Sequence, residues 1–247
     1  MPENRPTTYW DYIRVPDLLA LQGGVEHDEG TPSQDEVLFI TAHQVYELWF
    51  KLILGSLGEA RDLFALPHVP DDQLAGVSRR LDRIATILHI ATDHLRVIET
   101  LTPRDFLDFR EKLFPASGGQ SPQFREIEIL MGLPDEARLP YVSDGDYRDV
   151  LREPDGTDGW AASRVLERLA DVPTFKDAVE DWLHRTPING STPDDDADAG
   201  VVVAFLDDFL ARHGVASVAQ ADHAAALAGG GEAEARLIQA LVDHRGK

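Results

Sequence analysis

The chain has 247 residues and a formal net charge of −21, from 44 acidic and 23 basic side chains. This balance argues against nucleic acid and anionic membranes as partners, because both need basic patches. The chain contains no cysteine, which excludes disulfides, thiolate nucleophiles and zinc–cysteine sites. We expect no signal peptide and no membrane-spanning segment, and we therefore predict a soluble, cytoplasmic protein.

The first 30 residues contain a short aromatic segment that starts at Tyr9, a leucine-rich turn of helix and a polar loop. Apolar residues then recur at helical spacing over two long stretches, 35–66 and 71–101. Pro67 and Pro70 separate these stretches, because proline cannot continue a helix. The pattern predicts two long core helices.

A third helix is predicted from Thr102 to about Phe114, because Thr102 and Asp105 have the spacing of an N-terminal cap with a proline between them. A fourth is predicted from Ser121 to about Met131. Shorter helices are expected over 145–152, 158–170, 173–185, 199–213, 219–228 and 231–244. No segment has the pattern of a strand ladder. We therefore predict an all-α fold, a helical bundle that forms a single domain over 1–247.

Two aromatic residues are each followed, four positions later, by a residue that can bind a polar group. Phe39 precedes His43 in the first long helix, and Phe106 precedes Arg110 in the third helix. Residues four apart share a helix face, so each pair projects together. Aromatic rings beside a guanidinium group suit an aromatic amino acid as ligand. The rings can stack on its side chain, and the guanidinium can form two hydrogen bonds with its carboxylate.

Each of these residues also has an ordinary structural interpretation when it is taken alone. A single histidine on an apolar helix is more often a core residue, and Arg110 alone would be an ion-pair residue. His43 and Glu47 have the spacing of two metal ligands, but the sequence shows no third ligand. The acidic run 194–198 is a poor match to a calcium loop and favours a solvated loop that caps the next helix.

Four blocks, taken together, carry a resemblance to a known family. They are 9–13, 35–51, 99–110 and 117–128, and they occur in this order. Together they resemble tryptophan 2,3-dioxygenase over roughly residues 8 to 131. The resemblance implies an all-α, tetrameric protein with b-type heme. It also implies the activity, in which both atoms of O2 are inserted across the C2–C3 bond of the indole of tryptophan to give N-formylkynurenine.

The resemblance also implies roles for residues at the matching positions. His43 corresponds to the histidine that forms a hydrogen bond with the indole N–H, and Arg110 corresponds to the arginine that binds the substrate carboxylate. Phe39 corresponds to an aromatic wall of the indole pocket. Ser117 and Gly118 correspond to the loop over the heme that approaches oxygen and the substrate amine. An N-terminal segment that reaches into a neighbouring subunit is represented by Tyr9, Tyr12 and Ile13.

The sequence departs from the family pattern at several positions. Phe106 replaces a tyrosine that assists the arginine, and Gln34 and Leu95 replace a histidine and a tryptophan. The family's proximal heme ligand is a histidine in a Trp-Arg-x-x-His motif, followed by a Gly-Thr-Gly-Gly-Ser-Ser-Gly loop, and neither occurs here. His223 and His244 are nearby candidates without the matching flanks. Either the chain is shortened relative to its relatives, or another residue binds the iron, or there is no heme.

Four functions therefore remain open on the sequence. The favoured one is a heme-dependent dioxygenase that acts on tryptophan or a substituted tryptophan. The alternatives are a heme-dependent aromatic hydroxylase of secondary metabolism, a heme-free protein that binds an aromatic amino acid, and a helical scaffold. For the enzyme we expect a homo-oligomer, with O2 and an aromatic amino acid as its small-molecule partners.

Overall fold

The computed structural model describes residues 7–24, 31–114, 116–138, 147–153 and 155–227, with side chains up to residue 214. The chain divides into two compact units, Met1–Asp181 and Trp182–Lys247, which are described separately below. Within the described ranges the regular elements are helices, apart from one isolated bridge between Ile188 and Ser191. The all-α prediction is confirmed, whereas the single domain over 1–247 stays a prediction.

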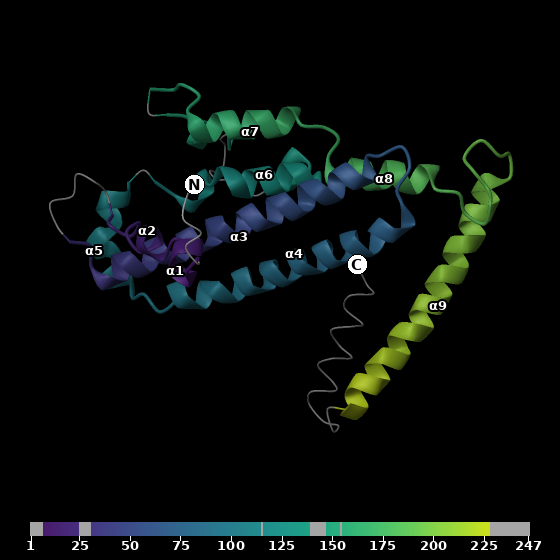
Figure 1. Cartoon of the computed structure of the whole chain (residues 1–247), viewed down its shortest axis with the longest axis horizontal. Coiled ribbons are helices and arrows are strands. Elements are labelled where there is room, and N and C mark those ends of the chain that lie inside the picture. The colour runs from purple at the N-terminus through teal and green to yellow at the C-terminus, as the bar shows by residue number, and fades with distance from the viewer. Residues whose placement is uncertain (1–6, 25–30, 115, 139–146, 154, 228–247) are drawn as a thin grey trace. The chain divides into compact units, whose positions relative to one another are not determined.

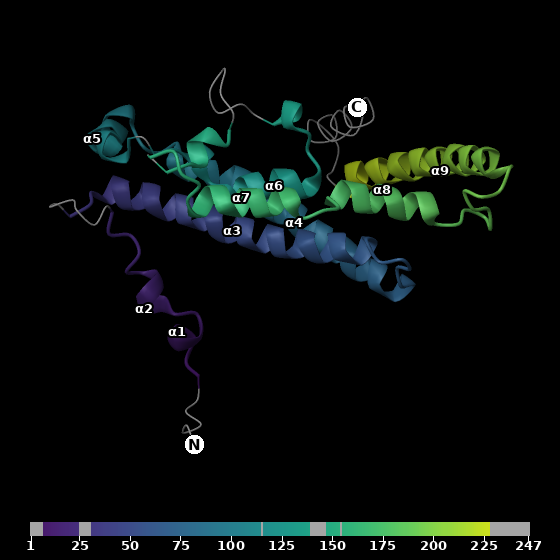
Figure 2. The same ribbon diagram turned by 90° about the horizontal axis from the view of Figure 1, so that it is seen from above.

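The first unit is organised around two long antiparallel helices that lie side by side, α3 (Gln34–Phe64) and α4 (Asp71–Ile98) (Figures 1 and 2). The hydroxyl of Ser33 caps the start of α3 by accepting a hydrogen bond from the backbone N–H of Glu36. These bounds confirm both long helices predicted from the apolar spacing.

The core of this unit lies between α3, α4 and a shorter helix, α6 (Pro122–Met131). Its buried side chains are aliphatic: Ile53, Leu54, Leu57, Ile84, Ile87 and Leu130. Each such side chain stabilises the fold by about 1.5–3 kcal/mol when it is fully removed from water. Helix α7 (Trp160–Ala170) packs on α6, which lies between α7 and α3 in Figure 1. The core thus fixes α6 and α7 relative to the middle of α3.

Helix α5 (Pro103–Leu113) begins with the predicted cap. Thr102 accepts a hydrogen bond from the N–H of Asp105, and the Asp105 carboxylate accepts one from the N–H of Thr102. The helix contacts the first part of α3, and its buried Phe109 faces Phe39. This contact places α5 beside the α3 segment that contains Phe39 and His43.

The other elements of this unit are short. They are α1 (Tyr9–Tyr12), α2 (Val15–Leu18), most of α8 (Phe175–Arg185), and 3-10 turns at Gly118–Gln120, Asp135–Ala137 and Asp149–Leu151. The helix predicted over 145–152 is wrong in its described part, which contains only the last of these turns. Pro154 follows closely in the sequence and disfavours helical backbone at the residue before it, which leaves little length for a helix.

In the second unit, α9 (Asp198–Leu227) is one continuous helix. The described residues of the two helices predicted over 199–213 and 219–228 are helical, but the predicted break between them is wrong. A single glycine such as Gly214 costs a helix only about 1 kcal/mol. The acidic loop before α9 makes local hydrogen bonds. The carboxylate of Asp195 accepts hydrogen bonds from Thr192, and the carboxylate of Asp198 accepts one from the hydroxyl of Ser191. The helix predicted over 231–244, His244 and the side chain of His223 lie outside the described residues.

Among the described residues, α3 is long and apolar enough to cross a membrane by length and composition. This differs from the expectation, based on sequence, that no segment is able to span a membrane. One helix of this kind decides little, because the core helix of a soluble protein passes the same test. Here α3 packs against α4, α5 and α6 and contributes Ile53 and Leu57 to the core.

Candidate functional site

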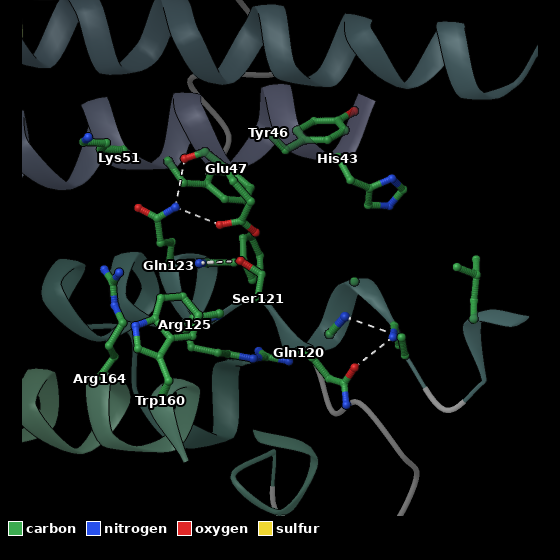
Figure 3. Close-up of a pocket in the computed structure, with 18 of the residues that line it drawn as sticks. His43, Tyr46, Glu47, Lys51, Gln120, Ser121, Gln123, Arg125, Trp160 and Arg164 are labelled. Carbon is green, nitrogen blue, oxygen red and sulfur yellow. Dashed lines mark hydrogen bonds between the residues drawn. The ribbon is translucent and has the colours of Figure 1, made fainter. Parts of the chain in front are cut away.

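A cavity of about 1100 Å³ lies between α3, α6, α7 and the segment that precedes α6 (Figure 3). Its aromatic lining consists of Phe39, Tyr46, Phe50, Phe124 and Trp160. Its polar and charged lining includes His43, Glu47, Lys51, Ser117, Gln120, Ser121, Gln123, Arg125 and Arg164. A space of this size accommodates a small aromatic molecule with room to spare.

His43 presents one ring nitrogen that has no partner among the described residues. Its ring packs against Phe39 with the centroids 4.1 Å apart, and its Nδ1 lies 2.8 Å from the carbonyl oxygen of Phe39. A carbonyl oxygen only accepts hydrogen bonds, so Nδ1 is the nitrogen that carries the proton. The neutral ring then has its lone pair at Nε2. His43 can therefore accept a hydrogen bond from a ligand in the cavity.

Tyr46 lies one turn along α3 from His43 and connects this part of the cavity lining to α4. Its hydroxyl donates to the carbonyl oxygen of Ala91 at 3.0 Å, and its ring stacks on His94 with the centroids 5.0 Å apart. Burial raises the pKa of Tyr46, so the phenol stays neutral at physiological pH. The edge of the Tyr46 ring faces His43, with 6.4 Å between the ring centroids.

The two aromatic pairs noted in the sequence meet where α3 and α5 touch. The ring of Phe39 lies 5.8 Å from that of Phe106 and 5.5 Å from that of Phe109, measured between centroids. Arg110 lies one turn further along α5, is half-buried, and makes no hydrogen bond or ion pair with any residue that the structure describes. Phe39 lines the cavity, whereas Phe106 and Arg110 are not among its lining residues.

Ser117 and Gly118 line the cavity at the start of the 3-10 turn before α6. The N–H of Ser117 donates to the side-chain oxygen of Gln120 at 3.0 Å, and the N–H of Gly119 donates to the Ser117 hydroxyl at 3.3 Å. Figure 3 shows the bond from Ser117 to the labelled side chain of Gln120 as a dashed line. These bonds hold the turn in one conformation.

The other polar part of the lining joins α3 to α6. The side-chain amide of Gln123 donates to both the carbonyl oxygen and the carboxylate of Glu47, at 2.9 and 2.8 Å (Figure 3). Arg125 is buried and donates to Glu128 at 2.7 Å, but its Nε has no hydrogen-bond partner among the described residues. Local spacing in the sequence predicts no role for Gln123 or Arg125, although both lie in the last of the four blocks.

Arg164 of α7 lies at the edge of the cavity beside Trp160. Its Nε donates to Glu126 at 2.6 Å, and its guanidinium lies over the Trp160 ring, 5.2 Å from the centroid. The hydrogen bond to Glu126 raises the pKa of Arg164. Arg164 therefore stays cationic, although a large part of its charge is already balanced. The sequence alone does not reveal the pair of Arg164 and Glu126, because the two residues are far apart in the chain and meet only when it folds.

Tyr9, Tyr12 and Ile13 belong to the N-terminal segment and do not line the cavity. Tyr9 and Tyr12 are 73% and 81% exposed, and Ile13 is 42% exposed. Side chains this large and apolar are well suited to contact another surface. Their predicted role in a neighbouring subunit stays a prediction.

No group of three potential metal ligands occurs among the residues that the structure describes. The pairing of His43 with Glu47 gains no further ligand, and Glu47 is instead bonded to Gln123. Within the described lining, His43 is the only imidazole. Any imidazole other than His43 that binds an iron here would come from outside this lining.

Comparison with known proteins shows to which family the chain belongs. A family model described as tryptophan 2,3-dioxygenase matches residues 2–222. The chain belongs to the tryptophan 2,3-dioxygenase family. It is 53% identical to a tryptophan 2,3-dioxygenase of Sorangium cellulosum over 184 residues, which cover 74% of this chain and 45% of that protein.

Two further relatives show the same relationship. The chain is 49% identical to tryptophan 2,3-dioxygenase 2 of Ralstonia nicotianae over 83% of this chain and 54% of that protein. It is 40% identical to tryptophan 2,3-dioxygenase A of Danio rerio over 72% of this chain and 42% of that protein. The chain thus spans about half the length of the curated relatives it matches. The resemblance seen in the four sequence blocks is confirmed.

Proposed function

We propose that this chain forms the substrate-facing part of a heme-dependent tryptophan 2,3-dioxygenase. The reaction would insert both atoms of O2 across the C2–C3 bond of the indole of L-tryptophan, giving N-formylkynurenine. The observation that carries this proposal is the unpartnered Nε2 of His43, held beside Phe39 at the wall of an aromatic cavity.

His43 and Phe39 would bind the indole. The lone pair at Nε2 accepts the indole N–H, while the Phe39 ring packs against one edge of the bicycle. The bond from Nδ1 to the Phe39 carbonyl oxygen fixes the tautomer that this role needs. The aromatic lining would keep water away from the reacting carbons.

Arg110 would bind the substrate carboxylate. A half-buried guanidinium without a carboxylate partner is costly, so an anionic ligand beside it is favoured. Phe106 offers no hydroxyl, so Arg110 is the residue of α5 that would make this contact. Ser117 and Gly118 would approach the amine end of the substrate and the reacting O2.

The residues present fit part of a heme site. The apolar faces of Phe50, Phe124 and Trp160 suit a flat macrocycle, and the cavity of about 1100 Å³ is large enough for it and a substrate. When bound, the heme would activate O2. His43 would bind the substrate in this proposal, so we assign no described residue as a ligand to the heme iron.

The proposal extends to the assembly and its location. We infer a homo-oligomer, a tetramer by family resemblance, in which Tyr9, Tyr12 and Ile13 reach the cavity of a neighbouring subunit. The exposure of both tyrosines supports this contact. Cytoplasmic location and the absence of a membrane partner are part of the same proposal.

A second candidate is a heme-free protein that binds an aromatic amino acid. It is favoured by the single imidazole in the described lining, since a heme iron is usually held by an axial ligand that the substrate does not use. It keeps the same roles for His43, Phe39 and Arg110, and it predicts tryptophan binding without heme.

One experiment separates these functions. Protein produced with a supply of heme is purified, its absorption spectrum is recorded, and it is incubated with L-tryptophan and O2. A heme spectrum with a product heavier by two oxygen atoms supports the dioxygenase, and a gain of one oxygen atom identifies a hydroxylase instead. Calorimetric binding of tryptophan to protein without heme, weakened by His43→Ala, supports the second candidate. No binding and no product would contradict both.

A further inference from the structure

Gln120 occupies a position that no role above explains. It lies at the last position of the 3-10 turn Gly118–Gln120 and lines the cavity. Its side-chain oxygen accepts from the N–H of Ser117 at 3.0 Å, and its side-chain nitrogen donates to the carbonyl oxygen of Val150 at 3.0 Å. The backbone N–H of Gln120 also donates to the carbonyl oxygen of Ser117 at 3.0 Å.

The carboxamide of Gln120 therefore joins the cavity turn to a packed part of the fold. Val150 belongs to the 3-10 turn Asp149–Leu151, where Leu151 is buried with Ile129 and Val165. The carboxamide of glutamine accepts at its oxygen and donates at its nitrogen. Glutamate keeps the acceptor alone, and methionine keeps neither.

Ser117 is held by these bonds in a way that leaves its hydroxyl hydrogen unused. The hydroxyl oxygen accepts from the N–H of Gly119 at 3.3 Å, but the O–H donates to no residue that the structure describes. Ser117 lines the cavity, so this hydrogen is available to an acceptor on a ligand there.

We propose that Gln120 is a positioning residue, which fixes the turn so that the Ser117 hydroxyl donates to a carboxylate oxygen of the aromatic amino acid, the one acceptor at its amine end. The inference rests on the proposed function, because it concerns the polar end of the same substrate. Gln120 acts through Ser117 and need not touch the substrate itself.

A double-mutant cycle tests this coupling. Ser117→Ala and Gln120→Met should each raise the KM for L-tryptophan about fivefold, the value of one ordinary hydrogen bond, with a smaller change in kcat. The double variant should resemble Ser117→Ala alone, because Gln120 has nothing to position once the hydroxyl is gone. Effects that multiply, or a KM that Gln120→Met leaves unchanged, would overturn the proposal.

Asp177→Ala is the matched control. Asp177 and Thr174 form the same kind of reciprocal cap, in which the Asp177 side chain accepts from the N–H of Thr174 at 3.1 Å and the hydroxyl of Thr174 accepts in return. Neither residue lines the cavity. This variant should lose stability and leave the KM unchanged, alone or combined with Ser117→Ala, which separates positioning from general destabilisation.

Amide hydrogen exchange tests the same arrangement without any substrate. The N–H groups of Ser117 and Gly119 should exchange faster in Gln120→Met than in the unaltered chain, while Gln120→Glu should retain protection at Ser117. If Gln120→Met does not fold, Gln120→Glu still tests the bond to Val150 through the KM. Unchanged exchange overturns the positioning role even if tryptophan is turned over. Faster exchange in a protein without tryptophan activity contradicts the proposed function alone.

Discussion

The Nδ1 atom of His43 lies 2.8 Å from the carbonyl oxygen of Phe39, one helical turn earlier in α3. One helix thus supplies the aromatic wall, the imidazole, and the backbone acceptor that sets the imidazole's tautomer. If the indole N–H binds at Nε2, His43→Ala should lower kcat/KM for tryptophan about tenfold or more, since a buried hydrogen bond is lost. Steady-state kinetics measure this, and His89→Ala, an exposed change on α4, should leave kcat/KM as it is.

Removing the charge of Arg110 should weaken binding of the carboxylate. Arg110→Gln should raise the KM for tryptophan roughly 10- to 100-fold, as expected for a hydrogen-bonded ion pair. Inhibition by tryptamine, which has the indole but no carboxylate, should be unaffected. Arg104→Gln on the same helix is exposed and serves as the control. Equal losses for tryptophan and tryptamine would show that Arg110 supports the fold and does not bind the carboxylate.

Truncation of the core between α3 and α4 should be costly. Leu57 is completely buried, and Leu57→Ala should reduce the free energy of unfolding by about 2–5 kcal/mol through lost burial and the cavity left behind. Urea denaturation followed by circular dichroism measures this. Leu107, which is 64% exposed on α5, should lose little stability on the same change. Similar losses at both positions would contradict the assigned core.

The ion pair between Arg61 and Asp171 should contribute to stability in a pH-dependent way. The hydrogen bond from Arg61 holds the pKa of Asp171 below its ordinary value. Because the folded pKa is lowered, the contribution is complete above the unfolded pKa of about 3.9 and is lost as pH falls through the folded pKa. Asp171→Asn should therefore lower Tm at pH 7, and the difference should shrink in acid.

Thermal unfolding at a series of pH values checks this prediction. Asp82→Asn is a suitable control, because Asp82 is exposed on α4 and its carboxylate pairs with no residue that the structure describes. The contribution of Asp171 is expected to be modest, since its side chain is 40% exposed and solvent screens the pair. A difference in Tm that persists at low pH would argue against the ion pair as its source.

Local patterns predicted the long helices and the cap of α5 well. The spacing of apolar residues gave α3 and α4, and Thr102 with Asp105 gave the start of α5. These features depend on residues that are close in the sequence, so the sequence alone is sufficient to predict them. Gly214 misled the prediction because a single glycine is tolerated within a helix when the surrounding residues favour it.

The candidate site was predicted only in part. The spacing of Phe39 and His43 predicted that they project together, and their rings are in contact. The partners of Gln120, Gln123 and Arg164 come from other elements of the fold and have no signal in local spacing. Sequence therefore predicted the contact between Phe39 and His43, but not the contacts that hold the cavity-lining residues in place.

The positions of His43, Glu47 and Lys51 on α3 set a length scale for whatever the cavity holds. They follow one another at four-residue intervals and all line the same space. An α-helix rises about 1.5 Å per residue, so an imidazole, a carboxylate and an ammonium are attached about 6 Å apart along one rigid axis. A molecule that contacts all three groups must therefore lie along α3, because their points of attachment extend over about 12 Å of the helix axis.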